Sequence, residues 1–177
     1  MLTPNFRTLP NWPNEVHHVL QAERVRQVAF VPDAGLTHLI QLCESDSAMH
    51  SVRLTTEQEG VALLAGAWLG GEKGILLMQS SGVGNCINML SLTSGSRFPL
   101  LMLVTMRGEE GETNPAQVPM GSATSRVLEA MGVRVTRAES EAGIAELVLA
   151  ALQRAYADNS AEAVLIAQHV LGFKAFK

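Results

Sequence analysis

The sequence contains little of what marks nucleic-acid-binding and membrane proteins. Aromatic residues make up 5% of the 177 residues, too few for the stacking platforms that bind single-stranded nucleic acids. The formal net charge of −4 provides no general attraction to phosphate backbones or anionic lipids. No apolar run reaches the roughly 20 residues that span a bilayer. We therefore expect no nucleic-acid partner and no membrane association.

Cysteines and targeting signals are scarce as well. The two cysteines, Cys43 and Cys86, lie far apart and lack the spacing of metal ligands. This favours two reduced core residues of a cytosolic protein over a disulfide or a metal site. The first residues lack the basic start and the apolar run of a signal peptide. We expect a cytoplasmic protein with no metal ligands of its own.

Apolar segments of strand length alternate with segments of helical periodicity. Near-continuous apolar strands between helices are typical of a parallel sheet covered by helices on both faces. We predict a single doubly wound α/β domain over residues 14–177, with a parallel sheet of about six strands, after a loose N-terminal segment, residues 1–13. The predicted strands are 27–32, 51–54, 74–79, 99–105, 133–135 and 163–166, and the predicted helices are 14–23, 35–44, 56–69, 85–93, 123–131 and 141–156.

Ligands of such sheets bind outside the carboxyl ends of the strands, where this sequence places four polar segments. They are Asp33–Ala34, Thr55–Glu57, Gln79–Asn85 and the loop 107–120. A site at this edge would be built from these segments.

One segment, Thr56-Glu57-Gln58-Glu59, matches a capping box at the start of an apolar helix. In that motif the Thr56 hydroxyl meets the Glu59 amide while the Glu59 carboxylate reaches back. Glu57 would then gain only a modest stabilisation from the helix dipole. Taken alone, the pattern favours this structural interpretation of Glu57 over a catalytic one.

A second segment, Gly82-Val83-Gly84, suggests a phosphate-binding turn between a strand and a helix. A dinucleotide fingerprint would place a third glycine where Ile87 stands. The next strand ends in Arg107, which at best hints at a 2′-phosphate. An NADP-binding oxidoreductase module therefore stays as an alternative, whereas no P-loop pattern occurs.

The charged loop after the fourth strand holds Arg107, Glu109, Glu110 and Glu112. Charge runs are usually solvated, but a loop of this length inside a compact domain is more often functional. Arg107 is its natural ligand for a carboxylate or sulfonate, because its planar fork binds oxyanions in bidentate fashion. The histidines show no catalytic or metal spacing: His17, His18 and His50 are interpreted as surface residues, and the roles of His38 and His169 stay open.

Five motifs then follow one another in a fixed order. Together they resemble the alpha subunits of sulfopyruvate decarboxylases and, more broadly, the phosphonopyruvate decarboxylases, from about residue 15 to the C-terminus. Several motifs in order are far more specific than any one of them. The motifs are Val31-Pro32-Asp33, Thr56-Glu57-Gln58-Glu59-Gly60-Val61-Ala62, Met78-Gln79-Ser80-Ser81-Gly82-Val83-Gly84-Asn85, Arg107-Gly108-Glu109-Glu110-Gly111-Glu112 and Pro115-Ala116-Gln117-Val118-Pro119-Met120-Gly121.

The resemblance implies a thiamin-diphosphate enzyme, of which residues 14–177 would form the pyrimidine-binding domain. The family's catalytic glutamate lies in the first turn of a helix, nine residues before a glycine, which corresponds to Glu57 and Gly66 here. In the family it shares a proton with N1′ of the aminopyrimidine and so promotes the thiazolium ylide that attacks a 2-oxo acid. The implied cofactor-binding residues are Glu57, Gln79, Ser80, Ser81, Gly82 and Asn85.

The family binds the diphosphate and Mg²⁺ through a Gly-Asp-Gly motif, which occurs nowhere in the 177 residues. The resemblance therefore implies an active site shared with a separate diphosphate-binding beta subunit, in an assembly of at least two copies of each chain. This chain would be inactive without that partner and would hold only the pyrimidine end of thiamin diphosphate, with Mg²⁺ on the partner.

The implied reaction is the decarboxylation of a 2-oxo acid, with Asp33, Arg107 and Gln117 as substrate-pocket residues. Phosphonopyruvate decarboxylases carry an Asp-Glu-Pro-Gln-His-like run where this chain has Asn114-Pro115-Ala116-Gln117-Val118. That departure favours conversion of 3-sulfopyruvate to sulfoacetaldehyde and carbon dioxide over phosphonopyruvate or another 2-oxo acid. A non-catalytic homologue that only binds a partner subunit is the remaining alternative.

Overall fold

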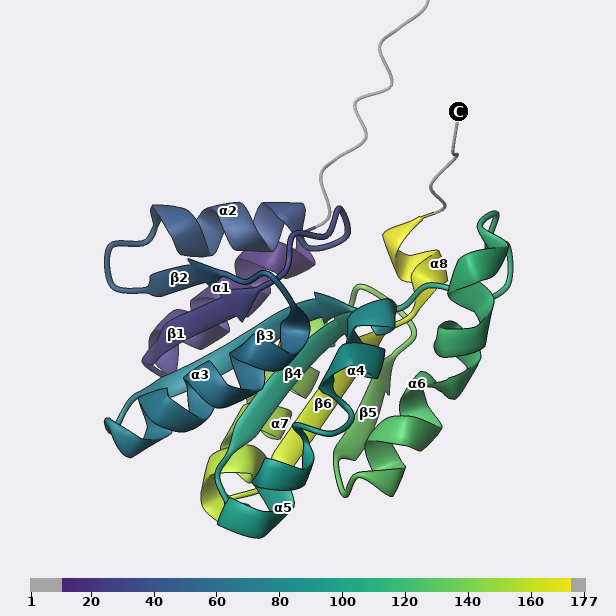
Figure 1. Ribbon diagram of the computed structural model, residues 1–177. Coiled ribbons are helices and arrows are strands. Elements are labelled where there is room, and N and C mark those ends of the chain that lie inside the picture. Colours follow the sequence, from purple (N-terminus) through teal and green to yellow (C-terminus); the bar gives the residue numbers. More distant parts are fainter. Residues whose placement is uncertain (1–10, 173–177) are drawn as a thin grey trace, which may run out of the picture.

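The computed structural model describes residues 11–172, which fold around one six-stranded sheet (Figure 1). All five strand pairings are parallel, and the strand order is β2-β1-β3-β4-β6-β5. The strands are β1 Val25–Phe30, β2 His50–Arg53, β3 Lys73–Gln79, β4 Leu100–Thr105, β5 Arg134–Ala138 and β6 Ala161–Ile166. The helices are α1 Trp12–Ala22, α2 Thr37–Ser45, α3 Glu57–Leu69, α4 Ser80–Cys86, α5 Ser91–Ser96, α6 Val118–Ala130, α7 Ile144–Asp158 and α8 Gln168–Leu171, with a 3-10 turn, η1, at Pro115–Gln117.

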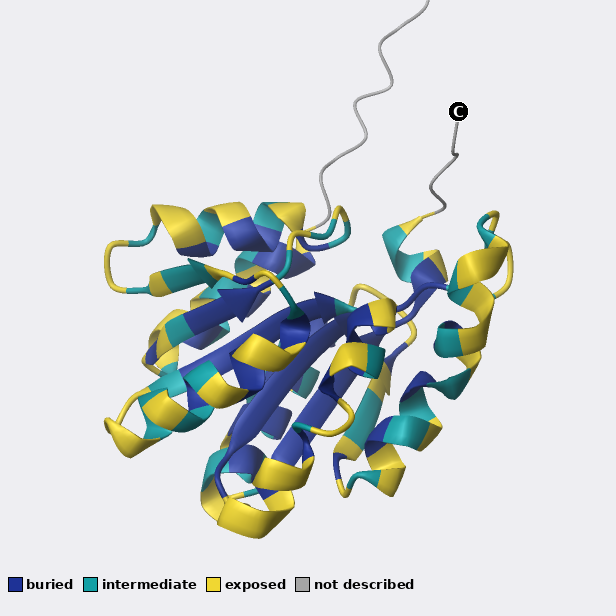
Figure 2. Ribbon diagram, viewed as in Figure 1, coloured by how far each residue is buried: buried dark blue, intermediate teal, exposed yellow. Residues whose placement is uncertain are grey.

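The central strands of the sheet are largely buried (Figure 2). Alternate residues of these strands belong to two separate hydrophobic cores. In β4, Leu101 and Leu103 pack with residues of α1, α2 and α7, while Leu100, Met102 and Val104 pack with residues of α3, α4 and α6. All six residues of this strand are buried, as expected for a parallel sheet covered on both faces. The predicted doubly wound α/β architecture and its six strands are confirmed.

The sheet changes winding direction between β1 and β3, which are neighbours in space. The helix after β1, α2, lies on one face of the sheet, and the helix after β3, α4, lies on the other. Such a switch point opens a crevice outside the carboxyl ends of the strands. The polar segments predicted to form a site all start at this edge.

The segment after β3 differs from the predicted helix over 85–93. Helix α4 begins directly at Ser80, and a short α5 follows from Ser91 after a break. Serine and glycine have low helix propensity, so the sequence pattern favoured a turn there. Burial of Val83 and Cys86 in the core beneath α4 outweighs that local preference.

Smaller differences occur at both ends of the described region. Helix α1 begins at Trp12, two residues before the predicted start, and Trp12 and Pro13 are buried. The rest of the predicted loose segment, residues 1–10, lies outside the described residues. A short helix that the pattern did not predict, α8, follows β6.

Both cysteines are free and buried, as predicted. Burial, followed by the nearby Glu57 carboxylate, raises the pKa of the Cys86 thiol to about 12. Among the described helices, none is long and apolar enough to cross a membrane.

Candidate active site at the carboxyl edge of the sheet

Glu57 is the first residue of α3, and only 8% of its surface is exposed. The chain enters this helix from β2 through an extended Thr56, with φ −141° and ψ 153°. The predicted capping box does not form, because the buried Thr56 hydroxyl makes no hydrogen bond to the described residues. Glu59 instead accepts a hydrogen bond from the Thr55 backbone N–H at 3.0 Å. A capping box therefore does not account for the buried Glu57 carboxylate.

The Glu57 carboxylate is held by α4. Its Oε2 accepts a hydrogen bond of 2.7 Å from the Asn85 side-chain amide. Gly82 lies against the same carboxyl group, and a Cβ at this position would overlap it. The glycine is thus needed for close approach rather than for a turn. Within the described residues, Oε1 of Glu57 accepts no hydrogen bond from another side chain.

Gly82-Val83-Gly84 lies inside α4. The glycine turn between strand and helix that the oxidoreductase alternative requires is therefore not formed. Helix α4 follows β3 without a loop because Gln79, in an extended conformation, leads directly into it.

Gln79 contacts the segment that leads into α6. Its side-chain amide donates to the Ser81 hydroxyl at 2.7 Å and to the side-chain oxygen Oε1 of Gln117 at 3.2 Å. Ser80 is fully buried, and its hydroxyl accepts a hydrogen bond of 3.0 Å from the Arg107 backbone N–H. The structure thus joins three of the predicted segments at one edge.

Arg107 follows β4 and is 8% exposed. Its Nε and Nη2 donate to the two carboxylate oxygens of Glu112 at 2.6 and 2.7 Å. This bidentate ion pair holds the pKa of Glu112 well below its usual range and raises that of Arg107. Arg107 thus already has one carboxylate partner from its own loop, which the sequence analysis did not foresee.

Asp33 lies beside this ion pair. Its Oδ2 accepts hydrogen bonds from the Thr105 hydroxyl at 2.9 Å and from the Gly35 backbone N–H at 2.8 Å. Asp33 also acts electrostatically on Arg107. Both residues line a small cavity of about 70 Å³, together with Thr105 and Gln168.

The charged loop after β4 is ordered by its carboxylates rather than solvated. Glu112 accepts from the backbone N–H groups of Gly108 and Asn114 at 3.1 and 2.8 Å, and Glu109 pairs with Arg137 at 2.7 Å. Sequence reasoning missed Glu112 as a partner of Arg107. Its spacing of five residues from Arg107 inside a loop carries no regular signal.

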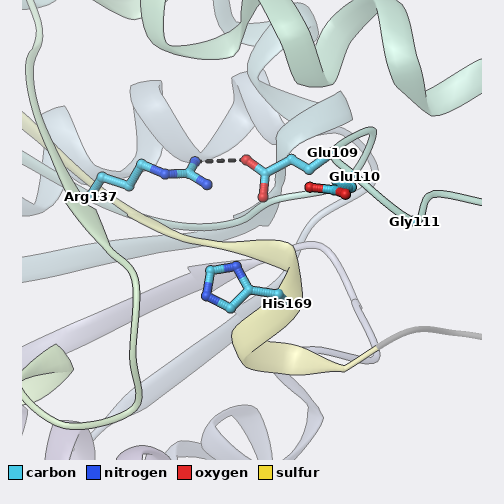
Figure 3. Close-up of a pocket in the computed structure, with 5 residues that line it drawn as sticks. All are labelled: Glu109, Glu110, Gly111, Arg137 and His169. Carbon is cyan, nitrogen blue, oxygen red and sulfur yellow. Dashed lines mark ion pairs between the residues drawn. The ribbon is translucent and has the colours of Figure 1, made fainter.

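A larger cavity of about 600 Å³ lies on the other side of this loop (Figure 3). The Arg137 guanidinium points at the Glu109 carboxylate there, and His169 of α8 faces the same space. Its Nε2 lies 2.9 Å from the Glu139 carbonyl oxygen. The other histidine left open, His38, lies 3.3 Å from the Asn14 side-chain amide. Within residues 11–172, neither histidine forms a hydrogen bond or ion pair with a predicted site residue.

Among the described residues, no group of three histidine, cysteine, aspartate or glutamate side chains could hold a metal ion. The chemically distinctive group of the edge is Glu57, because it is a nearly buried carboxylate with one oxygen open to a further donor. An N–H group of a ligand that approaches Oε1 would complete its hydrogen bonding.

Comparison with known proteins identifies close relatives of the chain. It is 41% identical over 115 residues to the sulfopyruvate decarboxylase subunit alpha of Methanothermobacter thermautotrophicus, covering 63% of this chain and 70% of the relative. It is 36% identical over 124 residues to the subunit of the same name from Methanococcus maripaludis, covering 70% and 74%. A phosphonopyruvate decarboxylase of Streptomyces viridochromogenes is 42% identical over 107 residues, 59% of this chain but 27% of that protein. No family model matches the chain.

Among solved structures, the chain resembles a 2-oxoglutarate:ferredoxin oxidoreductase from Magnetococcus marinus with a TM-score of 0.70. The sequences are 14% identical, and the likeness covers 90% of this chain but 29% of that one. It therefore shows a shared fold, and it agrees with the predicted α/β fold class.

The buried Arg107–Glu112 pair predicts an acid-sensitive contribution to stability. Glu112 has a lowered pKa in the folded protein, so its contribution is complete above the unfolded value near 4.5 and declines as the pH falls below it. Removing one partner of a buried pair costs about 3 kcal/mol. Urea unfolding of Glu112→Gln should show this loss at pH 7, and a smaller one at pH 3.5.

Glu110→Gln is the matched control, since Glu110 is an exposed residue of the same loop. It should change the free energy of unfolding by less than about 0.5 kcal/mol at either pH. A Glu112→Gln loss that stays constant between pH 7 and 3.5 would contradict the assigned ion pair.

Proposed function

The chain belongs to the family of sulfopyruvate decarboxylase alpha subunits, and from this membership we propose that it is the pyrimidine-binding component of a thiamin-diphosphate-dependent 2-oxo acid decarboxylase. Its relatives span both separate subunits and longer proteins, since the match covers 70% of one alpha subunit but 27% of a phosphonopyruvate decarboxylase. We assign residues 14–177 to the pyrimidine-binding domain.

The observation that carries the proposal is the placement of Glu57. A carboxylate buried to 92% at the start of an apolar helix is costly unless a partner satisfies it. Asn85 satisfies Oε2, and Oε1 is available to a donor. We propose that Oε1 would face N1′ of the aminopyrimidine, which would act as the donor when it carries the proton that it shares with Glu57. When bound, thiamin diphosphate supplies the electron sink for decarboxylation.

The residues of this chain have separate tasks in that reaction. Glu57 holds or releases a proton at Oε1, while Asn85 and the close approach of Gly82 fix the orientation of its carboxyl group. Gln79 and Ser81 lie on the adjoining surface at the end of β3, and the buried Ser80 between them bonds the Arg107 backbone. Burial of the carboxylate strengthens its hydrogen bond to the cofactor, because water is excluded from the contact.

We propose 3-sulfopyruvate as the substrate, with sulfoacetaldehyde and carbon dioxide as products. Asp33, Arg107 and Gln117 lie on the loops at the same edge, and Arg107 supplies positive charge toward the sulfonate or carboxylate group. Glu112 orients the guanidinium through two bonds, which suits a planar, bidentate contact with an oxyanion. Phosphonopyruvate and other 2-oxo acids are the competing substrates.

We further propose that a separate beta subunit holds the diphosphate and Mg²⁺, with at least two copies of each chain in the assembly. The name of the relatives, subunit alpha, supports a partner chain. A non-catalytic homologue that only binds such a partner is the alternative. It predicts no carbon dioxide release from any 2-oxo acid by the assembled pair.

Replacing Glu57 with glutamine should lower kcat of the assembled enzyme by roughly 100-fold or more, the usual scale for a proton-transfer residue. The substitution removes the acid–base group but preserves side-chain size and the contact with Asn85. Carbon dioxide release from sulfopyruvate, phosphonopyruvate and pyruvate by the co-purified pair provides the measurement and also ranks the substrates.

Glu59→Gln is the control, because Glu59 occupies the same helical turn and bonds only the Thr55 N–H among the described residues. Its kcat should stay within about twofold of wild type, since a surface substitution changes little. Near-normal turnover of Glu57→Gln would refute the assigned role.

The packing of Gly82 against Glu57 predicts a sharp difference between two glycines of one helix. A Cβ in Gly82→Ala overlaps the Glu57 carboxyl group, whereas in Gly84→Ala it meets the flexible Met120 sulfur at 3.2 Å. Both changes raise helix propensity by about 1 kcal/mol. Gly82→Ala should lower kcat at least about tenfold, and displacing a catalytic group by 1 Å is sufficient for this.

Gly84→Ala should keep kcat within about twofold of wild type, because Met120 can move aside at low cost. Equal losses in both variants would mean that α4 tolerates no alanine at all. The contact between Gly82 and Glu57 would then not be the cause.

A further inference from the structure

Gln168 connects the end of β6 to the charged loop after β4. It is the first residue of α8 and is 3% exposed. Its backbone N–H donates to Glu109 Oε2 at 2.8 Å, and its side-chain carbonyl oxygen accepts from the Glu109 N–H at 3.0 Å. Its side-chain amide nitrogen donates to Glu112 Oε2 at 3.0 Å. One buried residue thus forms hydrogen bonds to two acidic residues of the loop.

A carboxamide can make both side-chain contacts at neutral pH, whereas a carboxylate cannot. It offers a donor to the Glu112 carboxylate and an acceptor to the Glu109 N–H, whereas an ionised carboxylate offers acceptors alone. Hydrogen bonds to charged groups are also stronger than those between neutral groups. A glutamate at position 168 would therefore place two carboxylates within contact distance.

The contact with Glu112 leads directly to Arg107. The Oε2 atom that receives the Gln168 amide also accepts from Arg107 Nε at 2.6 Å. Glu112 can hold the guanidinium in one orientation only while its own position is fixed. Gln168, Arg107, Asp33 and Thr105 line the same small cavity, so a shift of this carboxylate would change the cavity wall.

We propose that Gln168 is a positioning residue that locks the loop 108–114 onto the end of β6 and so orients Arg107 toward the anionic group of the substrate. The proposal rests on the proposed function of Arg107. It gives Gln168 a role in substrate binding rather than in the chemical step, because its side chain meets the loop carboxylate and not Glu57.

Two substitutions at this position test the proposal in the assembled enzyme. Gln168→Glu should raise KM for sulfopyruvate roughly tenfold or more at pH 8, with kcat within about twofold, because uniform binding is lost rather than transition-state stabilisation. At pH 6 its KM should fall back toward wild type, since a carboxylic acid flanked by Glu109 and Glu112 regains a proton and a donor. Gln168→Ala should show a raised KM at both values.

Wild type and Gln41→Glu are measured at the same pH values. Gln41 is an exposed residue of α2, so this variant adds the same charge without touching the loop. The described charged groups around position 168 are Asp33, Arg107, Glu109, Glu112, Arg137, Glu139 and His169. The wild-type ratio corrects for pH effects that do not arise at position 168.

A second readout does not depend on turnover. Amide hydrogen exchange at Glu109 and Asn114 should accelerate about tenfold or more in both Gln168 variants and stay unchanged in Gln41→Glu, because these N–H groups bond Gln168 and Glu112. Unchanged exchange at both amides would show that Gln168 does not fix the loop 108–114. Faster exchange with an unchanged KM would contradict the proposed role of Gln168 in orienting Arg107. A KM of Gln168→Glu that stays raised at pH 6 would contradict it as well.

The two readouts also separate this proposal from the proposed function. If the wild-type pair decarboxylates no 2-oxo acid, the proposed function fails and the substrate role of Gln168 fails with it. The exchange measurement still decides whether Gln168 holds the loop.

Discussion

A carboxylate buried at the start of an apolar helix is the constraint on which this edge of the protein depends. Glu57 enters α3 with 8% of its surface exposed, and it has to be held by groups from another element. Helix α4 supplies them, through the Asn85 amide and through the missing Cβ of Gly82. For this contact α4 has to begin immediately after β3, which in turn buries Ser80 beneath Arg107. Contacts at Glu57 and Ser80 thus join the segments that follow β2, β3 and β4.

The charged loop after β4 also buries ionised side chains, but here they pair with each other. Arg107 and Glu112 are buried together: the Arg107 guanidinium donates to the Glu112 carboxylate, which also accepts from Gln168 and from backbone N–H groups. A buried pair of this kind adds little net stability but resists the loss of either partner. The edge therefore combines a carboxylate left open on one side, Glu57, with a guanidinium held in place. These two features are what a cofactor proton relay and an anion-binding loop need.

Much of this arrangement could be predicted from the sequence, since it follows from periodicity. The strands β1 to β4 end near Asp33, Glu57, Gln79 and Arg107 in turn, and these residues lie at one edge because parallel strands share their carboxyl ends. The capping box and the glycine turn were wrong, since both were judged from local pattern while tertiary packing decided them. Gln168 was missed for another reason: it contacts Glu112 across 56 residues of sequence, and no local signal reports such a distance.

The central claim is that this chain forms half of a cofactor site, with Glu57 on the pyrimidine side. Calorimetric titration of thiamin diphosphate with Mg²⁺ tests it most directly, first on the chain alone and then on the chain assembled with a diphosphate-binding subunit. The account predicts no measurable binding to the chain alone and one cofactor per pair of subunits in the assembly. Tight binding to the isolated chain, or none to the assembly, would contradict it.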